Sequence, residues 1–154
     1  MMSMEKNIEI QELNIQPQAG VIGVFSRLNY KPWYAIAEFV DNSTQSFYSH
    51  QQELADAGIN DIVVSIKYDV ENDVLIIMDT AFGMEIEDFA RAVKIDSPPD
   101  DKTGRNEFGM GLKTAASWFG NIWSVRSTQF GSNHEYYTEI NIPELRSNNI
   151  NSVT

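Results

Sequence analysis

The sequence predicts an α+β fold in which a mostly antiparallel sheet carries helices on one face. Two observations support this fold class: apolar residues recur at helical spacing in separate stretches, and β-rich runs come in neighbouring pairs with turn residues between them. With 154 residues, of which 42% are hydrophobic, the chain can bury one sizeable core and is most simply a single domain. We expect this domain over 31–145, preceded by a 1–30 segment that is a candidate strand or arm and followed by a flexible tail over 146–154.

The predicted elements follow one another as helix, hairpin, helix, loop, helix and hairpin. Pro32 suits a first helical position, and apolar residues then recur at helical spacing to about residue 50. The turn-forming residues 70–73 join two strands into an antiparallel hairpin, and Gly131 belongs to a similar turn between the last two strands. The expected ranges are helices over 32–50, 86–93 and 109–119, strands over 62–68, 74–78, 122–128 and 135–142, and a loop over 97–108.

The charge balance disfavours several classes of function. The formal net charge is -11, and only 11 Lys and Arg are scattered along the chain. Affinity for nucleic-acid phosphates comes largely from clustered Lys and Arg, so direct nucleic-acid binding by this domain is not expected. The chain has no cysteine, no membrane-length apolar run and no basic-then-apolar leader, so we expect no membrane span and a cytoplasmic location. A polyanionic ligand would need a divalent cation and the backbone amides of a helix N-terminus.

The first motif, residues 38–42, puts an acid and an amide on the predicted 32–50 helix. Glu38 and Asn42 are one turn apart, so their side chains project from the same face and can converge on one ligand. A carboxylate can accept a proton from an attacking water, while a neutral amide oxygen ligates Mg²⁺. The alternative is an ordinary solvated helix face opposite an apolar stripe.

The second motif, residues 79–84, ends an apolar strand with a carboxylate. Asp79 follows the apolar run 74–78, so we expect it at the end of a buried strand, where it needs a hydrogen-bond donor. An adenine amino group would serve, and Gly83 would let the backbone approach the ring closely. The alternative is that Asp79 caps the helix that begins near Glu85.

The third motif, residues 104–113, is a glycine loop that opens a helix. Gly104, Gly109 and Gly111 precede a helical run, so backbone amides could point at phosphate oxygens with the positive end of the helix dipole behind them. Lys113 could add a full charge. The alternative is a flexible loop before an ordinary helix. The motif lacks the usual Walker signature, and a dinucleotide fold fits poorly because the glycines come late and the strands pair as a hairpin.

In this order and at roughly this separation, the three motifs resemble the N, G1 and G2 boxes of the GHKL ATPases. This superfamily includes gyrase B, the heat-shock chaperones of the ninety-kilodalton class, histidine kinases and MutL. The resemblance extends from about Trp33 to Ile142, and residues 33–42 are especially similar to the MORC, MutL and heat-shock-chaperone branch. It implies the Bergerat fold, a two-layer α/β sandwich that matches the element order above.

The resemblance also implies a role for each matching residue. Glu38 would be the general base, Asn42 the Mg²⁺ ligand, and Asp41 a neighbour that supports the site. Asp79 would read the adenine amino group, with Gly83 and Met84 at the floor of the purine pocket. The phosphates would be wrapped by Phe108, Gly109, Met110, Gly111 and Leu112, and touched by Lys113.

The implied function is an ATP-binding module that hydrolyses ATP with Mg²⁺, slowly in isolation, and uses the nucleotide to order a lid at 97–108 and switch a dimer or partner contact. Two features leave alternatives open. Ala81 stands where the G1 box usually has glycine, and we see no following domain that would supply a lysine to the γ-phosphate. A homodimer, a downstream domain or a binding module without turnover therefore stays an open alternative. A histidine-kinase-type domain is disfavoured by Glu38. The choice between Thr128 and Thr138 as an adenine contact stays open.

Overall fold

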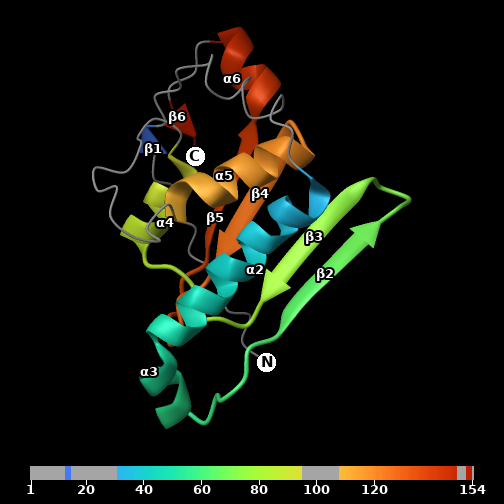
Figure 1. The fold of residues 1–154 in the computed structure, drawn as a ribbon. Helices are drawn as coiled ribbons and strands as arrows, with labels where there is room; N and C mark the ends of the chain where they lie inside the picture. Colours follow the sequence, from blue (N-terminus) through green and yellow to red (C-terminus); the bar gives the residue numbers. More distant parts are fainter. Residues whose placement is uncertain (1–12, 15–30, 95–107, 149–151, 154) are drawn as a thin grey trace, which may run out of the picture.

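Helices alternate with antiparallel strand pairs along the chain (Figure 1). The computed structural model describes residues 13–14, 31–94, 108–148 and 152–153. The described elements, in chain order, are β1 (Leu13–Asn14), α2 (Pro32–Ser49), α3 (Gln51–Asp56), β2 (Val64–Asp69), β3 (Val74–Asp79), α4 (Ile86–Val93), α5 (Phe108–Phe119), β4 (Ile122–Ser127), β5 (Tyr136–Asn141), α6 (Ile142–Asn148) and β6 (Ser152–Val153).

Helix α2 is the longest described helix and agrees with the predicted range to within a residue. Pro32 lies in its first turn, where the missing N–H removes no helical hydrogen bond. Its buried residues Ala35, Ser43 and Phe47 are separated by multiples of four, so they form one stripe along the helix. His50 ends the helix, and the chain turns into the short helix α3, which periodicity did not predict.

The strands form three separate antiparallel pairs. Strand β2 pairs with β3 from Val64–Asp79 to Asp69–Val74, and residues 70–73 close this hairpin as predicted. Strand β4 pairs with β5, and β1 pairs with β6. An α+β fold with antiparallel strands is therefore confirmed, but these strands do not join into one continuous sheet. The two-layer sandwich with a single sheet stays a prediction.

Helix α5 lies at the centre of the helical layer. It packs against α2, α4 and β4, and α4 also contacts β5, so these helices cover the β4–β5 pair (Figure 1). The rings of Phe39 and Phe119 stack between α2 and α5 with centroids 6.5 Å apart. All of residues 112–117 are buried, as expected for a helix that is surrounded by other elements.

A second core lies where α2 meets α3. Phe47, Leu54 and Phe82 are buried together, and four partly buried side chains pack against them, namely Ile59, Ile62, Ala81 and Phe130. The ring of His50 stacks on Phe82 at a centroid distance of 3.8 Å. This cluster ties the segment that follows β3 to the end of α2.

Strand β3 is less buried than its apolar sequence led us to expect. Val74, Met78 and Asp79 are exposed, and residues 75–77 are only half-buried. The cause is its place in the fold, because the β2–β3 hairpin lies at one side of the described structure with no further described strand beyond β2 (Figure 1). The expectation that Asp79 ends a buried strand was therefore wrong.

The ends of the chain and the predicted loop are described only in part. Of the 1–30 segment, Leu13–Asn14 forms β1, and within the expected 146–154 tail Ser152–Val153 pairs with it. The predicted loop over 97–108 lies outside the described residues, apart from Phe108, which begins α5.

No helix in the described ranges combines the length and the apolar character needed to cross a membrane.

Candidate functional site

Helix α2 contacts the other two sequence motifs directly. From the first motif, the Glu38 carboxylate lies against Gly111 in the first turn of α5. One residue beyond that motif, the Ser43 hydroxyl donates a hydrogen bond to Asp79 at the end of β3. Segments that are distant in sequence, at residues 38–43, 79 and 111, therefore meet around one helix.

The Glu38 side chain is packed closely onto α5. A Cβ atom added at Gly111 would lie 2.3 Å from Glu38 Oε2 and 3.2 Å from its Cδ atom. Such distances are shorter than ordinary van der Waals contact, so only glycine fits at position 111 while the carboxylate stays where it is. Glu38 is half-buried, and its carboxylate lies beside the first turn of α5.

Asn42 follows Glu38 by one helical turn and is also half-buried. Its Nδ2 atom is buried and has no hydrogen-bond partner within the described ranges. An unpaired buried donor costs about 1–3 kcal/mol, so the Nδ2 atom is a cost to the fold unless a ligand or water engages it. The same amide group carries the oxygen that could ligate Mg²⁺, and Mg²⁺ commonly takes one or two protein ligands together with phosphates and waters.

Asp79 accepts a hydrogen bond at each carboxylate oxygen. Its Oδ2 atom accepts from the Ser43 hydroxyl at 2.7 Å, and its Oδ1 atom accepts from the Ala81 N–H at 2.9 Å. An ionised carboxylate has about four acceptor positions, and the side chain is exposed, so it can accept a further bond from a ligand.

Ser43 was missed by sequence reasoning. Its hydroxyl has a local acceptor, the Phe39 carbonyl at 3.0 Å one helical turn earlier, so nothing in the sequence indicated that a second acceptor, Asp79, lies 36 residues away.

The segment after β3 is held against the segment after β4. Gly83 has φ +81°, and a Cβ atom there would lie 2.1 Å from the Thr128 carbonyl oxygen. The Met84 N–H donates to Ser127 Oγ at 2.9 Å, and the Phe130 N–H donates to the Phe82 carbonyl at 2.7 Å. Gly83 therefore allows a close approach of backbone, and its neighbour in this structure is another part of the chain.

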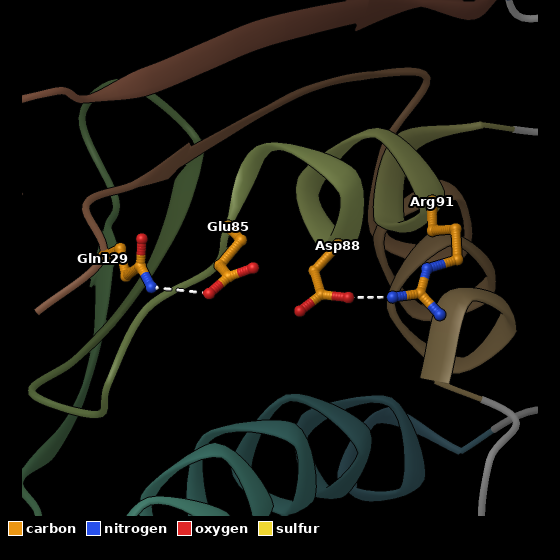
Figure 2. A network of polar contacts seen from close by, with 4 residues as sticks. All are labelled: Glu85, Asp88, Arg91 and Gln129. Atoms are coloured by element: carbon orange, nitrogen blue, oxygen red, sulfur yellow. Dashed lines mark hydrogen bonds and ion pairs between the residues drawn. The ribbon is translucent and has the colours of Figure 1, made fainter. Parts of the chain in front are cut away.

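A side-chain bond extends this junction to the start of α4. Figure 2 shows Glu85 directed toward Gln129, whose Nε2 atom donates to Glu85 Oε1 at 2.9 Å. One turn further along α4, Asp88 pairs with Arg91, and both side chains are exposed. The Glu85–Gln129 bond joins two segments, whereas the Asp88–Arg91 pair lies within one helix and is expected to contribute little.

Ala81 occupies the position where the resemblance leads one to expect glycine. Among the described non-glycine residues, only Asp73 has a positive φ, so the Ala81 backbone is in a region that any L-residue can adopt. Its side chain packs on the Phe47–Leu54–Phe82 cluster, and its N–H reaches Asp79. The fold of this segment therefore does not require glycine at residue 81.

Lys113 is buried, and its ammonium group donates to the Lys94 carbonyl at the end of α4. A cation at a helix C-terminus is stabilised by the macrodipole, which explains why this charge is accommodated inside the helical layer. Phe108, Gly109 and Met110 form the start of α5, and Leu112 is buried.

The two candidate threonines have different surroundings. Thr128 is exposed and adjoins Gly83, whereas Thr138 is buried on β5 opposite Val125. Within the described ranges, no three His, Cys, Asp or Glu side chains gather closely enough to hold a metal ion.

Comparison with known proteins gives one family. Residues 30–154 match the family described as "Histidine kinase-, DNA gyrase B-, and HSP90-like ATPase". A search of curated proteins found no significant match.

Proposed function

Because the chain belongs to the histidine kinase-, DNA gyrase B- and HSP90-like ATPase family, we propose that it binds ATP around α2 and hydrolyses it with Mg²⁺. The observation that carries the proposal is the convergence of three separate motifs on α2, through the Glu38–Gly111 contact and the Ser43–Asp79 hydrogen bond. An ordinary solvated helix face would point into water and would not make both contacts.

Adenine recognition is assigned to Asp79. Its carboxylate keeps acceptor capacity after its two protein hydrogen bonds, and the Ser43 hydroxyl and the Ala81 N–H fix its orientation. The neighbouring residues Gly83 and Met84 would form the floor of the purine pocket, supported by the junction with Ser127 and Thr128.

The phosphates would lie near the start of α5. The first-turn amides of a helix have no partner within the helix, and they and the helix dipole favour an anion there. A chain with net charge -11 otherwise offers a phosphate little positive charge. Asn42 would supply one oxygen to Mg²⁺, whose role is to neutralise phosphate charge. The Lys113 ammonium group donates to the Lys94 carbonyl, so a contact with a phosphate would use another of its three N–H donors.

Hydrolysis is assigned to Glu38, the acid nearest to the start of α5 on α2. A carboxylate there can accept a proton from a water that attacks the terminal phosphate, which favours transfer to water over transfer to a protein histidine. Coupling of the nucleotide to a lid at 97–108, to a dimer or to a partner stays a prediction.

Calorimetric titration with ADP and with a non-hydrolysable ATP analogue, each with and without Mg²⁺, tests binding. We expect Mg²⁺-dependent binding, and Asp79→Asn should weaken ADP by about tenfold or more, because a hydrogen bond to a charged group contributes about 1.5–3 kcal/mol. Asp88→Asn makes the same charge change on the exposed face of α4 and should leave affinity unchanged. Equal ADP affinity in the Asp79 variant would contradict the adenine role.

Turnover tests the role of Glu38. Glu38→Ala should keep nucleotide affinity and lower ATP hydrolysis by roughly 10²–10⁴-fold, the usual contribution of a general base. Glu87→Ala removes an exposed acid from α4 and serves as the control. Unchanged hydrolysis in the Glu38 variant would refute its role as the base, and binding without any hydrolysis by the unaltered chain would favour a nucleotide-binding module.

A further inference from the structure

We propose that Gly111 is a positioning residue for the Glu38 carboxylate. Its missing side chain leaves the space that the carboxylate occupies, so the contact between α5 and α2 at this point sets where the proposed base lies. The inference rests on the proposed function, and it gives Gly111 a task that differs from wrapping the phosphates.

The geometry shows that the space is needed for Glu38. A Cβ atom at Gly111 would lie 2.3, 3.2 and 3.9 Å from the Oε2, Cδ and Cβ atoms of Glu38, so the overlap is with the carboxyl group, and the contact with the stem is ordinary. No other side chain or backbone atom is among the three nearest. The conflict would therefore fall on the carboxylate itself.

Backbone conformation does not explain a glycine at this position. Gly111 lies in α5 and, unlike Gly83, lacks a left-handed φ, so an L-residue could adopt its conformation. Inside a helix, glycine lowers the folding equilibrium constant roughly fivefold relative to alanine. The close approach of Glu38 is the feature that accounts for its presence.

Neighbouring contacts restrict how the conflict could be relieved. Phe39, next to Glu38, stacks on Phe119 of α5, and Leu112, next to Gly111, is buried. Separation of the two helices would disturb the Phe39–Phe119 stacking, whereas the carboxylate is the end of a flexible side chain. A methyl group at position 111 should thus move the carboxylate and leave the fold intact.

The first test compares Gly111→Ala with Gly120→Ala. At Gly120 an added Cβ atom meets nothing closer than 3.4 Å, so this variant makes the same change just beyond the same helix without the conflict. For Gly111→Ala we expect kcat about tenfold to a hundredfold lower, because a displacement of a reacting group by about 1 Å can cost that much. Gly111 also lies in the first turn of α5, where the phosphates are proposed to bind, so affinities for ADP and for the ATP analogue are measured beside kcat and should fall by a clearly smaller factor. An unchanged kcat, or affinity lost in step with kcat, would overturn the proposal.

The second test needs no nucleotide. In a Glu38→Ala background the space is empty, so Gly111→Ala should raise the folding equilibrium constant by roughly fivefold. With Glu38 present, the same substitution should give a smaller gain or a loss. Equal effects in both backgrounds would refute the contact. A failure of the unaltered chain to bind nucleotide would instead refute the proposed function, so the two failures are distinguishable.

Discussion

Gly83 and Gly58 illustrate two different reasons why glycine is required at a position. Both have left-handed backbone, with φ +81° and +82°, but a Cβ atom at Gly83 would overlap the Thr128 backbone, whereas nothing lies within 4 Å at Gly58. Alanine at either position costs about 1–2 kcal/mol for its conformation. At Gly83 the overlap should add about 1–3 kcal/mol.

Urea denaturation of the two alanine variants measures this difference. We expect Gly83→Ala to lower the free energy of unfolding clearly more than Gly58→Ala, since only the first must push two backbone segments apart. Similar losses of unfolding free energy in both variants would show that the segments after β3 and β4 can move apart at little cost.

At the scale of elements, the β2–β3 turn contains two groups with shifted pKa values. Hydrogen bonds from the side chain and the backbone N–H of Asn72, assisted by the Glu71 N–H, lower the pKa of Asp69 below its ordinary value. The hydroxyl of Tyr68 donates to Asp73, and this bond raises the pKa of Tyr68. Both pKa shifts arise from hydrogen bonds between polar groups in and beside the turn, so these groups stabilise the turn.

The pH dependence follows from the direction of each shift. The stabilisation by ionised Asp69 is complete above the ordinary aspartate pKa of about 4 and is lost as the pH falls through the lowered value. The contribution of Tyr68 is complete below the ordinary tyrosine pKa of about 10 and is lost as the pH rises through the raised value.

An NMR titration of the Asp69 carboxyl carbon checks the acid side. Asn72→Ala removes the largest cause and should move the pKa of Asp69 back toward its ordinary value, while the backbone hydrogen bonds keep part of the shift. Asn60→Ala, an exposed position before β2, is the control. If Asp69 titrates normally in the unaltered chain, the turn does not hold its carboxylate as described.

At the scale of the whole molecule, the net charge of -11 should make stability depend on salt. Self-repulsion of a strongly charged chain disfavours the compact state, and salt screens it over about 10 Å at 0.1 M. We therefore expect the free energy of unfolding, measured by urea denaturation, to rise with NaCl.

A comparison of MgCl₂ with NaCl distinguishes charge screening from specific binding of Mg²⁺. Because we propose that Mg²⁺ binds together with the nucleotide phosphates, MgCl₂ at matched ionic strength should act like NaCl in the absence of nucleotide. With ADP present, Mg²⁺ should add stability, by about 2.7 kcal/mol when free ligand is at 100 times its Kd. A large stabilisation by Mg²⁺ alone would point to an independent ion site.

The sequence by itself determined the elements around the candidate site, and it predicted the candidate residues apart from Ser43. Helices α2, α4 and α5 and both hairpins lie within a residue or two of their predicted ranges. Helical spacing, the proline at the start of α2 and the turn at residues 70–73 act over a few neighbouring residues, so they can be read along the chain. The short helices α3 and α6 have too few turns to show such a pattern.

Only the tertiary structure decided how these elements meet. Three contacts join residues that are distant in sequence: the Ser43–Asp79 hydrogen bond, the packing of Glu38 against Gly111, and the bond from Lys113 to the Lys94 carbonyl. The separation of the strands into three pairs and the exposure of Asp79 likewise depend on what packs beside each strand. Spacing along a chain reports the period of one element, whereas these contacts depend on the relative placement of two, which close packing of the whole core sets.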